Sequence, residues 1–171
     1  MEQGTVIGPA RADDLGQVAE IFAHYVTHSV VTFETVPPAV ADWQARLDGL
    51  ADLGLPFLVA RTGGEVAGYA DASPWRPNPA YRHTVEDTVY LAPGATGRGL
   101  GRRLLAELLA RAGQTGARQM VAVIADAGAD SEASVALHRA FGFGHAGRLA
   151  AVGHKHGRWI DTVLMQRGLT P

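Results

Sequence analysis

The 171-residue sequence contains no cysteine. Disulfides, thiolate zinc sites, iron–sulfur clusters and a cysteine nucleophile are therefore all excluded. Lysine is nearly missing as well, because Lys155 is the only one and the other 14 of the 15 cationic residues are arginine. Any chemistry that the protein performs must use oxygen and nitrogen groups.

An excess of one charge and long apolar runs are also missing. A net charge of -2 gives no general attraction to nucleic acid or to an anionic membrane, since both require a basic surface. No apolar stretch approaches the length needed to span a bilayer, and the N-terminus lacks the basic start and apolar run of a signal peptide. We therefore expect a cytoplasmic protein with no nucleic-acid or membrane partner, in which any anion site is local.

The apolar residues that are present predict one domain over residues 1–171, long enough to bury roughly 70% of its unfolded surface. Helical spacing predicts helices at 15–25, 39–53, 100–112 and 134–141. Extended segments are predicted at 5–7, 30–33, 57–60, 66–72, 84–91 and 120–125, with a closing hairpin from 147 onward. This order of helices and strands predicts an α/β or α+β domain with a mixed sheet.

The most informative segment is 93–103, which joins a predicted strand to a predicted helix. Backbone N–H groups can approach a ligand closely at three alternate glycines, Gly97, Gly99 and Gly101. The same stretch holds three arginines, Arg98, Arg102 and Arg103. Because the helix dipole disfavours cations at this end, the arginines suggest a bound anion such as a phosphate. The alternative is a glycine-rich turn with solvated arginines.

The usual nucleotide loops do not match this segment. A P-loop would need Gly-Lys-Ser or Gly-Lys-Thr, and the single lysine is Lys155. The dinucleotide fingerprint fails because Arg102 stands where its third glycine belongs. The sequence therefore predicts a different pyrophosphate-carrying ligand.

Residues 96–101, Thr-Gly-Arg-Gly-Leu-Gly, resemble the acyl-CoA signature Q/R-x-x-G-x-G/A of the GCN5-related N-acetyltransferases (GNAT), with Thr96 departing at its first position. Further segments look like the phosphinothricin and methionine sulfoximine acetyltransferase branch of that family, in the same order: 75–81, 84–90, 137–138, 142–143 and 154–159. The resemblance covers nearly the whole chain. It implies the GNAT fold, a mixed twisted sheet of about six to seven strands flanked by about four helices, with splayed central parallel strands.

The resemblance also implies an activity: transfer of an acetyl group from acetyl-CoA, in a ternary complex and without a metal, to the α-amino group of a small amino acid or glutamate-like inhibitor. Such transfer detoxifies the inhibitor and would confer resistance. A different small amine as substrate, and a non-catalytic acyl-CoA-binding domain, remain open. A homodimer through the C-terminal strands is implied as well. The implied cofactor contacts are Val89, Tyr90, Leu91, Gly97, Arg98, Gly99, Leu100, Gly101 and Arg102, with Ser131 and Ser134 as weaker candidates.

The strand predicted at 84–91 carries the candidate general base. Glu86 falls where the branch has its proposed base, and desolvation on a sheltered strand would raise its pKa toward the range useful for deprotonating an ammonium. A paired structural carboxylate is the alternative. Asp87 interrupts the otherwise apolar face of this strand, and a β-bulge, which the resemblance also implies, would reconcile the pattern.

His138 is the candidate general acid, because the resemblance places it near the CoA sulfur and an unperturbed histidine titrates near pH 6.5. A helix-surface or capping histidine is the alternative reading. The resemblance builds the amino-acid pocket from Phe33, Glu34, Arg76, Pro79, Ala80 and Tyr81, together with Glu86. Within that set, Arg76 suits a carboxylate or phosphinate, or is a solvated loop arginine.

Two histidine pairs have spacings that would place both rings on one face, His24 with His28 and His154 with His156. A zinc hydrolase is conceivable on that basis. No HExxH motif accompanies the pairs, so we predict no metal site. A nucleophile-elbow serine hydrolase is disfavoured because Gly-x-Ser-x-Gly is absent.

Overall fold

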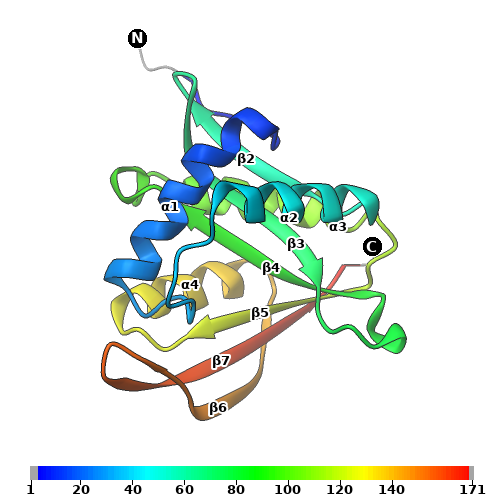
Figure 1. Cartoon of the computed structure of the whole chain (residues 1–171). Coiled ribbons are helices and arrows are strands. Elements are labelled where there is room, and N and C mark those ends of the chain that lie inside the picture. Colours follow the sequence, from blue (N-terminus) through cyan, green and yellow to red (C-terminus); the bar gives the residue numbers. More distant parts are fainter. Residues whose placement is uncertain (1–3, 170–171) are drawn as a thin grey trace.

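The computed structural model describes residues 4–169, which form a seven-stranded mixed sheet with helices on both faces (Figure 1). The strands follow the order β1-β2-β3-β4-β5-β7-β6 across the sheet. Their bounds are β1 Val6–Pro9, β2 Phe57–Thr62, β3 Glu65–Pro74, β4 Thr84–Leu91, β5 Gln119–Ala125, β6 Gly144–Lys155 and β7 Arg158–Gly168. The α-helices are α1 Leu15–His28, α2 Val40–Asp52, α3 Leu100–Ala112 and α4 Ala129–Ala140. The predicted fold class is confirmed.

Each face of the sheet packs against its own pair of helices, as the period of two along a strand requires. In β2, Phe57 and Val59 belong to the core formed with α1 and α2. Leu58 and Ala60, which alternate with them, belong to the core that contains the buried leucines of α3 and side chains of α4. The result is a three-layer arrangement in which α1 and α2 lie on one face and α3 on the other (Figure 1).

The centre of the sheet opens where its two parallel strands separate. β4 and β5 pair only over Thr84–Glu86 and Gln119–Val121, and beyond these residues they diverge. The predicted splay is confirmed. The predicted β-bulge in β4 is wrong, because the β3–β4 register runs without a shift from Pro74 opposite Val85 to Gly68 opposite Leu91.

Several local predictions are confirmed and two need correction. Strand 84–91 and helix 100–112 have the predicted bounds, and the 57–74 hairpin is present. The segment 30–33 consists of bends rather than a strand. There the Ser29 and Thr32 hydroxyls accept the backbone N–H groups of Val31 and Glu34, so local turns replace strand pairing. Helix α4 begins earlier than predicted, at Ala129. Across residues 4–169, no helix is long and apolar enough to cross a membrane.

Candidate active site

A cleft of about 470 Å³ lies at the point where β4 and β5 separate. Its walls come from α1 and the loop after it, β4, the turn before α3 and the start of α3, β5 and α4. The residues that line the cleft include Glu86, Asp87, Thr88, Val89, Tyr90, Leu91, Thr96, Gly97, Gly101, Ala122, Val123, Ile124, Ala125, Ser131, Ser134, Leu137 and His138. Most of the predicted cofactor residues are therefore brought together around one opening.

The backbone of β4 presents hydrogen-bonding groups to this cleft. The Ala92 N–H donates to the Ala67 carbonyl on β3 at 2.9 Å, so even-numbered residues direct their backbone groups toward β3. Odd-numbered residues, including Val89 and Leu91, direct theirs toward β5, which has already moved away. The Leu91 carbonyl accepts the Tyr25 hydroxyl at 2.6 Å. The amides of Val89 and Leu91 are thus placed for an extended ligand.

Tyr90, the residue between them, contributes its ring instead of its backbone. The ring stacks on Tyr69 with centroids 5.8 Å apart and meets the edge of Phe22 at 5.2 Å. Burial raises the pKa of Tyr90 to about 12, although a hydrogen bond with Thr32 opposes the shift. Tyr90 therefore stays protonated, and the residue forms part of the wall of the cleft.

The glycine turn reaches α3 in the conformation that the sequence predicts. Gly97 and Gly99 have φ angles of 73° and 75°, a left-handed region that favours glycine. Gly99 precedes the first residue of α3, Leu100, and the helix start carries no side-chain cap. The first N–H groups of a helix have no partner within it. Those of Leu100, Gly101 and Arg102 are therefore placed where they could hold an anion.

The three arginines near the turn do not act together. Arg98 is exposed, and Arg102 places its guanidinium carbon 5.2 Å from the centre of the Phe141 ring. Arg103 donates to the Thr5 carbonyl at 2.8 Å, which ties α3 to the segment before β1. Arg98 and Arg102 remain close to the turn, whereas Arg103 has a structural contact of its own.

Of the two serines predicted to contact the cofactor, Ser131 is already occupied by protein contacts. Its buried hydroxyl lies 2.7 Å from the Gly128 carbonyl and 3.3 Å from Asp126 Oδ1, and it accepts the Ala127 N–H at 3.1 Å. Ser131 therefore shapes the β5–α4 loop at the rim of the cleft. Ser134 lies one turn further along α4 and also lines the cleft.

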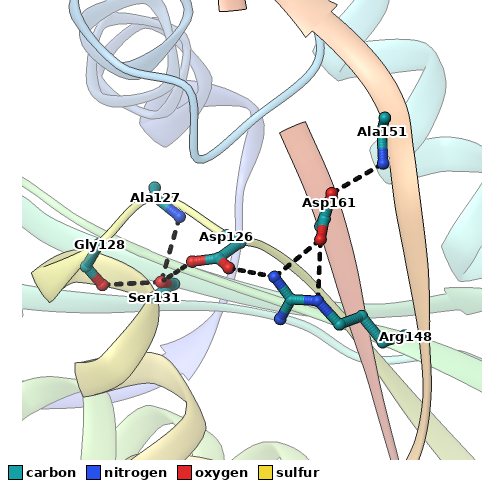
Figure 2. A network of polar contacts seen from close by, with 7 residues as sticks. All are labelled: Asp126, Ala127, Gly128, Ser131, Arg148, Ala151 and Asp161. Atoms are coloured by element: carbon teal, nitrogen blue, oxygen red, sulfur yellow. Dashed lines mark hydrogen bonds and ion pairs between the residues drawn. The ribbon is translucent and has the colours of Figure 1, made fainter. Parts of the chain in front are cut away.

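A surface network extends from this loop to the last two strands (Figure 2). Arg148 on β6 bonds both Asp126 and Asp161, and Asp161 on β7 accepts the Ala151 N–H at 2.7 Å. The hydrogen bond from Arg148 is the main reason that the pKa of Asp126 is lowered. The network joins the rim of the cleft to the β6–β7 hairpin.

His138 forms a buried pair with Asp87 beneath the cleft. Its Nε2 donates to Asp87 Oδ2 at 2.8 Å, and its Nδ1 donates to the Ser134 carbonyl at 2.7 Å. Because both partners accept, only the doubly protonated, cationic form of the ring satisfies both contacts. Burial alone would lower the pKa of His138, but the bond and charge of Asp87 outweigh it and the pKa is raised.

This pair explains why an acidic residue interrupts the apolar face of β4. Asp87 points toward α4, on the core side of the sheet, and its charge is matched there by His138. No bulge is needed to move the Asp87 carboxylate out of the core. No local sequence pattern signals the pair, since its two members are far apart in the chain and on different elements.

Glu86 lies where the cleft meets a second cavity of about 420 Å³. Thr88 and Tyr90 also line both spaces. Burial is the largest cause that raises the pKa of Glu86, the charges of Asp87 and Asp71 add to it, and two arginines oppose it. A carboxylate with a raised pKa between two cavities suits a general base that acts on a group held in one and a reactive centre held in the other.

The second cavity lies among α1, α2, β3 and β4. It is lined by Phe22, Thr32, Glu34, Pro38, Asp42, Trp43, Arg46, Tyr69, Ser73, Glu86, Thr88 and Tyr90. Of the residues predicted for the amino-acid pocket, Glu34 and Glu86 are among them. Phe33 packs on the backbone of Gly153, where an added Cβ would lie 2.4 Å from the ring.

The other predicted pocket residues lie elsewhere. Arg76 is exposed, with its guanidinium carbon 4.7 Å from the centre of the Trp75 ring, and it lines neither cavity. The short 3-10 helix Pro79–Tyr81 is also exposed and lies outside both. Among residues 4–169, Arg46 is the cation that lines the second cavity, and no motif in the sequence points to it.

The histidine pairs do not form a metal centre within residues 4–169. His24 and His28 have ring centroids 5.1 Å apart, but the described part of the chain contains no group of three histidine or acidic side chains placed to hold an ion.

Known proteins resemble this chain over nearly its whole length. Residues 18–143 match the model of the acetyltransferase (GNAT) family. A phosphinothricin N-acetyltransferase from Alcaligenes faecalis is 50% identical over 159 residues, covering 93% of this chain and 80% of that one. An L-methionine sulfoximine/L-methionine sulfone acetyltransferase from Pseudomonas aeruginosa is 40% identical over 166 residues, 96% of this chain and 95% of the other.

Among solved structures, a GNAT superfamily phosphinothricin acetyltransferase from Sinorhizobium meliloti in complex with AcCoA superposes with a TM-score of 0.91. It is 44% identical, and the match covers 97% of this chain and 89% of that one. The splayed strands, the glycine turn and the matches in sequence and structure agree. The chain belongs to the GNAT family of acetyltransferases.

Proposed function

We propose that this protein transfers the acetyl group of acetyl-CoA to the α-amino group of a small amino acid or of a glutamate analogue such as phosphinothricin, methionine sulfoximine or methionine sulfone. The observation that carries the proposal is the position of Glu86 between the two cavities. The names of the relatives supply the substrate class. Because acetyl-CoA is a cytoplasmic metabolite, we place the reaction, and any resistance that it confers, in the cytoplasm.

Acetyl-CoA occupies the cleft between β4 and β5. The N–H groups of Leu100, Gly101 and Arg102 bind its pyrophosphate at the start of α3, with Gly97 and Gly99 giving the turn its shape. The amides of Val89 and Leu91 hold its pantetheine arm along β4. The cleft fits this ligand because backbone donors of β4 and of the α3 start lie around one opening.

The second cavity holds the amino acid, whose ammonium loses a proton to Glu86. Glu86 passes this proton to solvent, and the free amine attacks the thioester carbonyl. As the C–N bond forms and the C–S bond breaks, the nitrogen gives its second proton to Glu86 and CoA leaves as a thiolate. We place the proton for the thiolate on His138, the cation that lines the cleft. Release of its Nδ1 proton requires the bond to the Ser134 carbonyl to break, while Nε2 stays on Asp87.

Turnover with a substrate panel tests the proposal. The protein is incubated with acetyl-CoA and with phosphinothricin, methionine sulfoximine, methionine sulfone and the common amino acids, and release of the CoA thiol is followed. We expect release with at least one member of the panel. Tight binding of acetyl-CoA without turnover of any amine would instead indicate a non-catalytic acyl-CoA-binding domain.

We also propose that the protein is a homodimer through its last strands. Three apolar side chains on the last two strands are exposed: Leu149, Val152 and Trp159. Trp159 is 70% exposed, and a second copy would remove this surface from water. Sedimentation should give twice the chain mass for the wild type and the single mass for Trp159→Arg. A monomeric wild type would refute this proposal.

A further inference from the structure

Arg46 on α2 is held in one orientation by Asp71 on β3. Its Nε donates to Asp71 Oδ2 at 2.8 Å and its Nη2 donates to Asp71 Oδ1 at 2.6 Å, a bidentate pair. The Asp71 side chain is fully buried, whereas that of Arg46 is 37% exposed. Asp71 thus fixes the plane of the guanidinium through one edge and leaves the Nη1 edge without a protein acceptor among residues 4–169.

Within the described residues, Arg46 is the one cation that lines the cavity assigned to the amino acid. Glu34, Asp42 and Glu86 line the same space. A cavity with one fixed cation and several carboxylates suits a ligand that carries both charges, as an amino acid does. An anion at the free edge of the guanidinium would lie closer to Arg46 than to Asp71, so the attraction to Arg46 dominates.

Two residues that line this cavity also carry buried hydrogen-bonding groups without partners. Trp43 Nε1 and Tyr69 Oη are buried and have no acceptor or donor within residues 4–169. Both residues line the cavity together with Arg46. Buried groups of this kind normally find a partner. A purely structural brace between α2 and β3 would not account for an arginine that faces such a space.

We propose that Arg46, positioned by Asp71, binds the α-carboxylate of the amino-acid substrate. The proposal rests on the proposed function, in which Glu86 receives the proton of the α-ammonium. Since the ammonium and the α-carboxylate are attached to one carbon atom, the cation that binds the carboxylate must lie near Glu86. Arg46 shares a cavity with Glu86, whereas Arg76 lines neither cavity, although the charges of both arginines act on Glu86.

Binding of methionine sulfone and of its α-amide to the CoA-saturated protein tests the proposal by calorimetry, independently of turnover. The wild type should prefer the acid by about 10- to 100-fold, the range of a charge-assisted hydrogen-bonded pair. The double variant Arg46→Gln/Asp71→Asn removes both charges and so leaves no unpaired carboxylate in the core. It should lose this preference while keeping the affinity for the amide and for CoA.

Two control variants show whether the preference for the acid depends on Arg46 in particular. Arg111→Gln/Glu107→Gln removes an exposed ion pair of α3 and should keep the preference for the acid. Arg76→Gln should keep it too. The proposal is overturned if the wild type binds acid and amide equally, if the Arg46 variant retains the preference, or if Arg76→Gln alone abolishes it. Absence of turnover with intact discrimination would count against the proposed function only.

Discussion

Of the two cavities that meet at Glu86, one is formed mainly by backbone and the other mainly by side chains. The cleft between β4 and β5 is shaped by backbone: diverging strands, left-handed glycines and the uncapped start of α3. The second cavity is shaped by side chains from α1, α2, β3 and β4, with the Arg46–Asp71 pair at its side. A backbone site tolerates many side chains and suits a ligand common to a whole family. A side-chain site can change its specificity with a single substitution.

The largest effect should come from Glu86, which belongs to both cavities. Glu86→Gln should lower kcat by about 10²- to 10⁴-fold, the usual contribution of a general base. Affinity for acetyl-CoA should stay near that of the wild type, and Glu65→Gln, at the exposed start of β3, should have no effect on either. Thiol-release kinetics and calorimetry measure the two quantities. A variant that keeps kcat within a few-fold would remove Glu86 from the mechanism.

The raised pKa of Glu86 adds a pH signature to this test. Because the base must be deprotonated to act, the wild-type rate should increase as the pH rises through the raised pKa. Glu86→Gln should lack that rising limb. The same limb in both proteins would show that another group controls it.

The next largest effect concerns the buried Asp87–His138 pair beneath the backbone-built cleft. Asp87→Ala leaves the buried His138 side chain without its partner and should lower the free energy of unfolding by about 3–5 kcal/mol. Glu107→Ala breaks an exposed pair and should change it by less than about 1 kcal/mol. Urea unfolding measures both. Equal losses of unfolding free energy in the two variants would mean that the buried pair stabilises the protein no more than the exposed pair does.

The pH dependence of stability follows from the direction of the His138 shift. The folded-state pKa is raised, so the contribution of the pair is fully present below the unfolded-state value of about 6.5. It is lost as the pH rises through the folded-state pKa. The wild type should therefore lose stability over that interval, and Asp87→Ala should not show this loss.

The smallest effect should come from the glycine turn and should be confined to the cofactor side. Gly99→Ala places a side chain on a left-handed residue, at a cost of about 1 kcal/mol. The Kd for acetyl-CoA should rise roughly five-fold, while the KM of the amino acid at saturating acetyl-CoA stays unchanged. Gly94→Ala is the matched control, since Gly94 has no positive φ and open space around it. A change in the amino-acid KM alone would reverse the assignment of the two cavities.

The difference between the cavities also explains what the sequence could predict. The strand at 84–91, the turn at Gly97 and Gly99, and the helix at 100–112 are local patterns, and the structure has all of them. Glu86 was singled out as a base, and the structure places it between the cavities. No local pattern points to Arg46, and Asp87 stands out in the sequence only as an interruption of an apolar face. The roles of both residues depend on partners in distant segments, Asp71 and His138. Arg76 was preferred for its place in a motif, but lies outside both cavities.

The central claim is that both substrates are bound at once, one in each cavity, with Glu86 between them. Initial rates of thiol release with acetyl-CoA and methionine sulfone both varied test this most directly. Double-reciprocal lines that intersect are the expected result, because direct transfer requires a ternary complex. Parallel lines, with an acetylated protein that can be isolated before the amine is added, would contradict the claim.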